Sequence, residues 1–114
     1  MLRYDSDFLA DIEQECLFIV ANFKKITYGQ FVDDEILIRA VSRSMEIIGE
    51  AVKNLSLELK NNHSVVSWKE IAGFRDKLIH HYFGIDYELV WEVIQNEIPD
   101  LLTNVTNILR AENI

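Results

Sequence analysis

The chain has 114 residues, 49% of them hydrophobic and 26% charged, and its formal net charge is -8. This length suits one domain, here residues 1–114, and the composition is globular, which excludes a disordered chain. The acidic charge argues against loose, nonspecific binding of nucleic acid. It leaves room for a small local basic site or for association with a basic partner.

The first five residues lack the apolar core of a signal peptide, and the longest apolar runs are too short to span a membrane. Cys16 is the only cysteine, which excludes an internal disulfide, and nothing suggests a zinc site. It lies within an apolar stripe, where a free cysteine usually acts as a small core residue. We therefore expect a cytoplasmic protein that does not associate with membranes.

Residues 7–25 are predicted to form the first helix, with Asp5 or Ser6 as its N-cap. Its apolar positions step by three or four: Phe8, Ile12, Cys16, Ile19, Phe23 and Ile26. Thr27 and Gln30 have the spacing of a capping box, which predicts a short helix through Val32.

The second long helix is predicted over residues 35–60, after Asp33 or Asp34 as its cap. Its stripe has nearly the heptad spacing of a bundle seam: Leu37, Val41, Ser44 with Met45, Ile48, Val52, Leu55 and Leu59. Gly49 lies inside this helix, where glycine costs about 1 kcal/mol relative to alanine. We expect it where a neighbouring helix comes close.

A second capping box, Ser67 with Glu70, predicts a third helix over residues 68–82, with Gly73 as an irregularity and Gly84 as a left-handed terminus. Asp86 is the expected cap of a last helix over residues 87–110, kinked at Pro99. No segment alternates as a strand would. The predicted fold is all-α, an antiparallel bundle of four to five helices, and its wide apolar stripes predict a homodimer.

The segment 73–84 is the one place where Arg, His and Tyr cluster, and it gathers Arg75, Lys77 and His80 in an acidic chain. An arginine fork matches a phosphate, and histidine transfers protons near neutral pH. Together they could support transesterification at a phosphodiester without a metal or other cofactor.

The predicted helix complicates this geometry. Residues five apart lie about 140° from each other around a helix, so Arg75 and His80 would not share a face, whereas Asp76 and His80 would. Arg75 would have to reach around the helix, or two copies of the segment would have to meet across a dimer axis. The end of the helix and Asp76 would both favour protonated His80.

Structural interpretations compete with the chemical one. Arg75 and Asp76 could form a solvated pair, His80 could pack in the core or cap a helix, and Tyr82 could pack beside Phe83. His80 and His81 point about 100° apart on a helix, which makes them a poor metal chelate. His63, in a polar loop, is expected to be solvated.

Arg75, His80 and Tyr82 match the R-x4-H-x-Y pattern, and the chain resembles the HepT-like toxins of the HEPN superfamily. The resemblance covers nearly the whole chain. It extends to the runs 38–51 and 68–74, to Val90-Trp91 and to residues 83–86. His81 occupies a slot that is often acidic in similar sequences.

This resemblance implies a HEPN helical bundle, usually a homodimer with two motifs across a shared cleft. It implies metal-independent endoribonuclease activity, with Arg75 and His80 catalytic, Asp76 and Tyr82 supporting, and RNA as substrate. It also implies a toxin–antitoxin system in which a minimal nucleotidyltransferase antitoxin adds AMP to Tyr82. Two alternatives stay open: a non-catalytic HEPN module that binds a nucleotidyltransferase or a nucleotide, and a plain helical oligomerisation protein.

Overall fold

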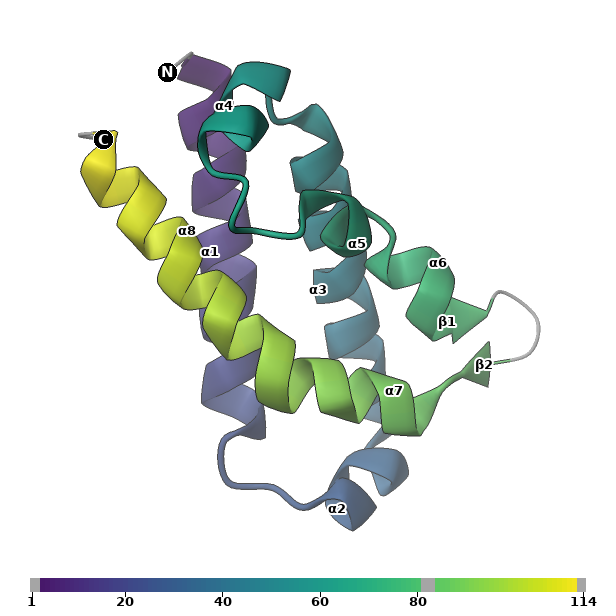
Figure 1. Cartoon of the computed structure of the whole chain (residues 1–114). Helices are drawn as coiled ribbons and strands as arrows, with labels where there is room; N and C mark the ends of the chain where they lie inside the picture. Colours follow the sequence, from purple (N-terminus) through teal and green to yellow (C-terminus); the bar gives the residue numbers. More distant parts are fainter. Residues whose placement is uncertain (1–2, 81–83, 113–114) are drawn as a thin grey trace.

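The computed structural model describes residues 3–80 and 84–112 (Figure 1). Its long helices are α1 (Arg3–Phe23), α3 (Glu35–Asn54) and α8 (Ile98–Ala111). Helix α1 packs against both α3 and α8, and the buried apolar residues of these helices form one core. The all-α bundle predicted from the sequence is confirmed.

The first apolar stripe is predicted correctly except at its two ends, since Ile26 is only partly buried and lies beyond the end of α1. Ile12, Cys16, Ile19 and Phe23 are buried, but Leu9 takes the core position expected for Phe8, which is only partly buried. Helix α1 also begins before both expected caps, since Asp5 already lies in its first turn. The Asp5 carboxylate accepts hydrogen bonds from Ser56 and is not the cap of α1.

Helix α2 (Tyr28–Asp33) begins with the predicted capping box, in which both the Thr27 and the Gln30 hydrogen bonds are formed. Phe31 anchors this short helix, since its ring packs edge-on against Phe23 and is stacked on Trp91. Asp34 then caps α3, as expected.

The predicted helix 35–60 is two helices. Helix α3 ends at Asn54, and α4 (Leu57–Asn62) follows with Ser56 as its N-cap. The Ser56 backbone N–H and hydroxyl donate to the two carboxylate oxygens of buried Asp5, at 2.8 and 2.6 Å. This long-range contact fixes an extended residue between the helices.

The predicted third helix is also wrong at Ile79 and His80, and its last two residues lie outside the described part of the chain. The chain forms α5 (Trp68–Ala72) and α6 (Phe74–Leu78), separated by Gly73, and then β1 (Ile79–His80). Strand β1 pairs antiparallel with β2 (Gly84–Ile85), where Gly84 has a φ of 87°. The helix stops because the Leu78 carbonyl accepts from the Asp86 backbone N–H, and because the next two residues, Ile79 and His80, are weak helix formers.

Two predicted termini need correction. Within the described chain, the Ser67 side chain makes no capping hydrogen bond, although α5 begins at the expected place. Gly84 does adopt a left-handed conformation, but it begins a strand and does not end a helix.

The last helical stretch begins as predicted, with the Asp86 side chain capping α7 (Tyr87–Glu92). A π-helical segment η1 (Val93–Glu97) joins α7 to α8, and Pro99 lies in the first turn of α8. The widened turn accommodates a residue that cannot donate a helical hydrogen bond. The ribbon changes direction between α7 and α8, at the interruption expected from Pro99 (Figure 1).

Across residues 3–80 and 84–112, no helix is both long enough and apolar enough to cross a lipid bilayer.

Candidate active site

Arg75 lies on α6, a helix of five residues that two buried apolar side chains anchor, Phe74 and Leu78. Glycine at position 49 allows α3 and α5 to approach closely, since a Cβ there would lie 3.1 Å from the Ala72 carbonyl oxygen. The expected role of Gly49 is therefore confirmed. This close approach also sets how near the following helix α6, with Arg75, lies to α3.

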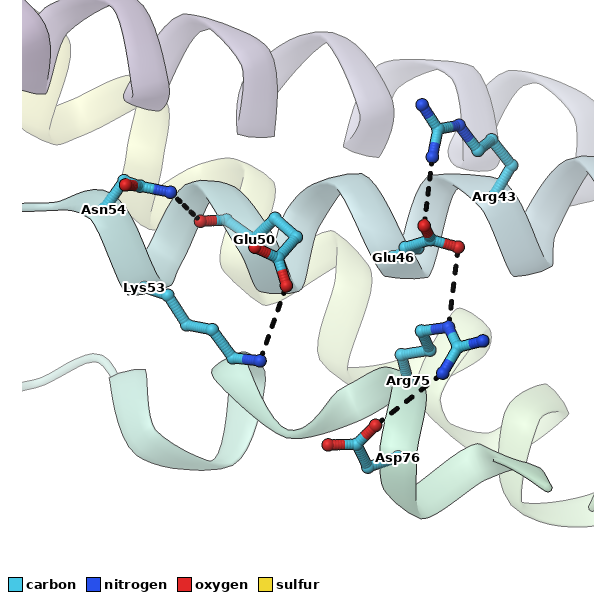
Figure 2. A network of polar contacts seen from close by, with 7 residues as sticks. All are labelled: Arg43, Glu46, Glu50, Lys53, Asn54, Arg75 and Asp76. Atoms are coloured by element: carbon cyan, nitrogen blue, oxygen red, sulfur yellow. Dashed lines mark hydrogen bonds and ion pairs between the residues drawn. The ribbon is translucent and has the colours of Figure 1, made fainter. Parts of the chain in front are cut away.

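The guanidinium of Arg75 is paired across the two helices with Glu46 (Figure 2). Arg75 Nε lies 3.4 Å from one Glu46 carboxylate oxygen, and Arg43 Nη1 lies 3.1 Å from the other. Asp76 is a more distant neighbour, with its Oδ1 3.8 Å from Arg75 Nη1. Arg75 is therefore a partly buried residue oriented from α3, and the pair with Asp76 is the weaker of the two.

A hollow of about 200 Å³ lies between α3 and the α5–α6 segment, beside Arg75. Three carboxylates and two cations line it, together with two small residues; the lining is Glu46, Gly49, Glu50, Lys53, Ala72, Arg75 and Asp76. Glu50 pairs with Lys53 at 3.5 Å, so part of this negative charge is compensated within α3. The hollow offers an arginine to an anionic group inside an otherwise acidic chain.

The structure places the backbone of His80 in β1, opposite Gly84. His80 therefore does not continue the helix of Arg75, and Asp76 and His80 are not one turn apart, which corrects the geometry expected from the sequence. The sequence also led us to expect that the end of a helix would favour protonated His80. This expectation loses its basis, because α6 ends at Leu78, two residues before His80. Tyr82 and His81 lie outside the described residues.

The expectation for His63 is wrong. Its Nε2 lies 3.0 Å from a carboxylate oxygen of Glu112, with both side chains about three-quarters buried, and its carbonyl accepts from the Trp68 indole. Over the part of the chain that the structure describes, no three His, Cys, Asp or Glu side chains come together as a metal site would require.

Glu46 and Arg43 are the residues that sequence analysis did not single out for chemistry. Two features of the sequence pointed to them: Arg43 and Glu46 are three residues apart on a helix, and Glu46 lies just before Gly49. Neither feature predicts a contact with Arg75.

Comparison with known proteins assigns a family to this architecture. The family model described as "Ribonuclease HepT-like" matches residues 12–108. The chain belongs to the HepT-like ribonuclease family. A "Putative RNase" of Caldanaerobacter subterraneus subsp. tengcongensis is 54% identical over 105 residues, which cover 92% of this chain and 94% of that protein.

Another relative is a "Probable ribonuclease HepT" of Thermococcus cleftensis, 40% identical over 101 residues, with 89% of this chain and 92% of that protein covered. No solved structure matches the chain significantly. The family and the names of these relatives support ribonuclease activity for this HepT-like chain, and they confirm the resemblance found in the sequence.

Proposed function

We propose that this HepT-like chain is the toxin of a toxin–antitoxin pair, and that it cuts RNA through Arg75 and His80 without a metal. The observation that carries the proposal is the pairing of Arg75 with Glu46, which holds a guanidinium at the edge of a hollow. His80 follows in the strand directly after the helix of Arg75. These two residue types supply the phosphate binding and the proton transfer that the reaction needs.

In this mechanism, Arg75 binds the scissile phosphate and stabilises the charge that develops on its oxygens. The imidazole of His80 accepts the proton of the ribose 2′-hydroxyl, whose oxygen forms a bond to phosphorus. The bond from phosphorus to the 5′ oxygen breaks, and that oxygen takes the proton back from His80. The products are a 2′,3′-cyclic phosphate and a free 5′-hydroxyl. We further propose a cytoplasmic, single-domain homodimer in which two such motifs face a shared cleft.

For regulation, we propose that a partner nucleotidyltransferase antitoxin adds AMP to Tyr82. The tyrosine oxygen would attack the α-phosphate of ATP, with pyrophosphate as leaving group. Phosphate groups two residues after His80 would block the site by bulk and by negative charge.

The deciding experiment is RNA cleavage in EDTA by the purified, unmodified protein. Arg75→Ala and His80→Ala should lose cleavage, and Arg39→Ala is the matched control. Arg39 is an exposed arginine of α3 that pairs with Glu35 and does not line the hollow. Cleavage by the parent and the control alone, with cyclic phosphate ends, supports the proposal. Equal cleavage by the His80 variant contradicts it.

The modification is tested by co-expression with the nucleotidyltransferase and peptide mass analysis. We expect AMP on the peptide of Tyr82 and none after Tyr82→Phe, whereas Tyr4→Phe, at an exposed tyrosine, should change nothing. AMP on Tyr28 or Tyr87 would overturn the assignment.

One observation favours a second function, that of a non-catalytic module which binds a nucleotidyltransferase or a nucleotide. The hollow contains three carboxylates against two cations, which would repel a polyanion such as RNA. If a folded, unmodified protein cuts no RNA, this second function replaces the first.

A further inference from the structure

A single carboxylate, that of Glu46, holds two arginines from different helices. One oxygen contacts Arg43 of the same helix at 3.1 Å, and the other contacts Arg75 of α6 at 3.4 Å. Figure 2 shows Glu46 between the two guanidinium groups, which approach it from opposite sides. The two cations are therefore kept on either side of one carboxylate, although they lie 32 positions apart in the sequence.

The contact with Arg75 is made at Nε, the nitrogen nearest the side-chain stem. A carboxylate at this position restrains the plane of the guanidinium from its base, and a planar fork binds phosphate only in certain orientations. Both side chains of the pair are partly exposed, at 33% for Arg75 and 41% for Glu46. Such pairs contribute little to stability, so orientation is the larger effect of this contact.

A second hollow adjoins the first one across α3. Its volume is about 220 Å³, and it lies between α1 and α3 with Arg43 in its wall; the lining is Phe8, Asp11, Arg43, Glu46, Ile47, Glu50, Ala51 and Asn54. Glu46 and Glu50 border both hollows, so they form the ridge between them. The apolar lining of the second hollow offers a surface on which a nucleobase can pack.

We propose that α3 supplies a second RNA subsite, in which Arg43 binds the backbone phosphate next to the scissile one. The base of that nucleotide lies over Phe8 and Ile47. Glu46 is a positioning residue that keeps Arg43 and Arg75 aligned along one strand. This inference rests on the proposed ribonuclease function and adds to it the place where the RNA continues. Three carboxylates, those of Asp11, Glu46 and Glu50, line this hollow against a single cation, so phosphate binding there depends on Arg43 alone.

The subsite is tested by binding of a single-stranded 2′-O-methyl RNA oligonucleotide, which lacks the attacking hydroxyl, at several salt concentrations. Losing one phosphate contact should lower the slope of log K against log salt by about 0.7. We expect this change for Arg43→Ala, with affinity reduced about tenfold at low salt. Arg43→Lys should keep most of the slope because it keeps the charge. Arg39→Ala is the matched control, since Arg39 is another exposed arginine on the same helix that also pairs with a glutamate.

The positioning role is tested by kinetics. Glu46→Gln should lower kcat about tenfold and change KM by less than about twofold, because it disturbs the orientation of Arg75 and keeps its charge. Glu35→Gln, which breaks a similar pair with Arg39, should leave both constants unchanged. Faster cleavage by Glu46→Gln would mean that Glu46 competes with RNA for Arg75, and would overturn the positioning role.

The outcomes separate the inference from the proposed function. A parent that cuts RNA, with an Arg43→Ala variant that binds like the control, overturns only the subsite. So does an Arg43→Ala variant that loses self-association with an unchanged salt slope, since Arg43 would then belong to a contact between copies. A parent that neither binds nor cuts RNA overturns both.

Discussion

Asp5 connects the beginning of α1 to the junction between α3 and α4, and its replacement should be costly. The residue is 97% buried, and both carboxylate oxygens accept hydrogen bonds from Ser56, one from the backbone N–H and one from the hydroxyl. The same hydroxyl accepts from the Leu59 backbone N–H and so begins α4. Asp5→Ala would remove the acceptor and leave the partly buried N–H of Ser56 unpaired.

The magnitude follows from these two bonds. A hydrogen bond to a charged acceptor contributes about 1.5–3 kcal/mol, and two bonds to one carboxylate are not fully additive. We expect Asp5→Ala to lower the free energy of unfolding by about 3–4 kcal/mol, out of a total of about 5–15 kcal/mol for a domain. Asp5→Asn keeps an oxygen for the backbone N–H and should lose about half as much.

Urea unfolding followed by circular dichroism measures this loss as a lower midpoint at an unchanged slope. Asp7→Ala is the control, because Asp7 is an exposed aspartate two residues further along α1. Its midpoint should stay close to that of the parent, within about 0.5 kcal/mol. If Asp5→Ala unfolds at the same urea concentration as Asp7→Ala, the contact with Ser56 does not stabilise the fold.

Three further predictions concern Cys16 and the glycines. Burial, and then the neighbouring carboxylates Glu15 and Glu13, raise the pKa of Cys16 to about 12. The folded protein should therefore resist thiol reagents at pH 8 until urea exposes the Cys16 side chain, and rapid labelling of the native state would contradict this. Gly84→Ala, at a φ of 87°, should lower the free energy of unfolding by about 1–2 kcal/mol and reduce RNA cleavage by disturbing the strand beside His80. Gly29→Ala is the control and should be tolerated, because the nearest atom to a Cβ added there lies 3.9 Å away. Gly49→Ala gains about 1 kcal/mol of helix propensity but forces the Ala72 carbonyl away. We expect the free energy of unfolding to fall by about 1 kcal/mol and RNA cleavage to slow. A variant as stable and active as the parent would argue against the close approach of α3 and α5.

Local signals in the sequence predicted most of the helices. The hydrogen bonds of the Thr27 capping box and the caps at Asp34 and Asp86 each join residues three apart, so composition and spacing are sufficient to find them. The helical period likewise identified most of the buried side chains of α1 and α3. The position of Gly49 inside a helix indicated a close neighbour, although the sequence could not say that Ala72 provides it.

The errors come from contacts between distant residues. Helix α3 ends early because the Ser56 backbone N–H binds Asp5, which lies 51 positions away in the sequence. The residues around Ser56 do not indicate this contact. Helix α6 ends at Leu78 because Asp86 takes its carbonyl, a contact that helical periodicity over residues 68–82 cannot reveal. The low helix propensity of residues 79–83 was the available warning.

In the candidate site, too, local features could be predicted and contacts between distant residues could not. Arg75 and His80 could be chosen from the residue types that phosphodiester chemistry needs, but their orientation was predicted wrongly, because it was derived from a helix that does not continue. The sequence did not indicate Glu46 as a partner of Arg75, because the two residues lie 29 positions apart on different helices.

The orientation of Arg75 must therefore originate in α3 more than in α6. A helix of five residues is too short to be stable by itself, and the strand that follows has two residues. Helix α3 has twenty residues and is packed on α1, and it approaches the α5–α6 segment through Gly49 and Glu46. A change at either position should then alter catalysis more than stability, even though neither residue belongs to the R-x4-H-x-Y motif. If Glu46→Gln and Gly49→Ala lowered the unfolding free energy and left cleavage intact, the buried side chains of Phe74 and Leu78 would be sufficient to place α6, and the orientation of Arg75 would not originate in α3.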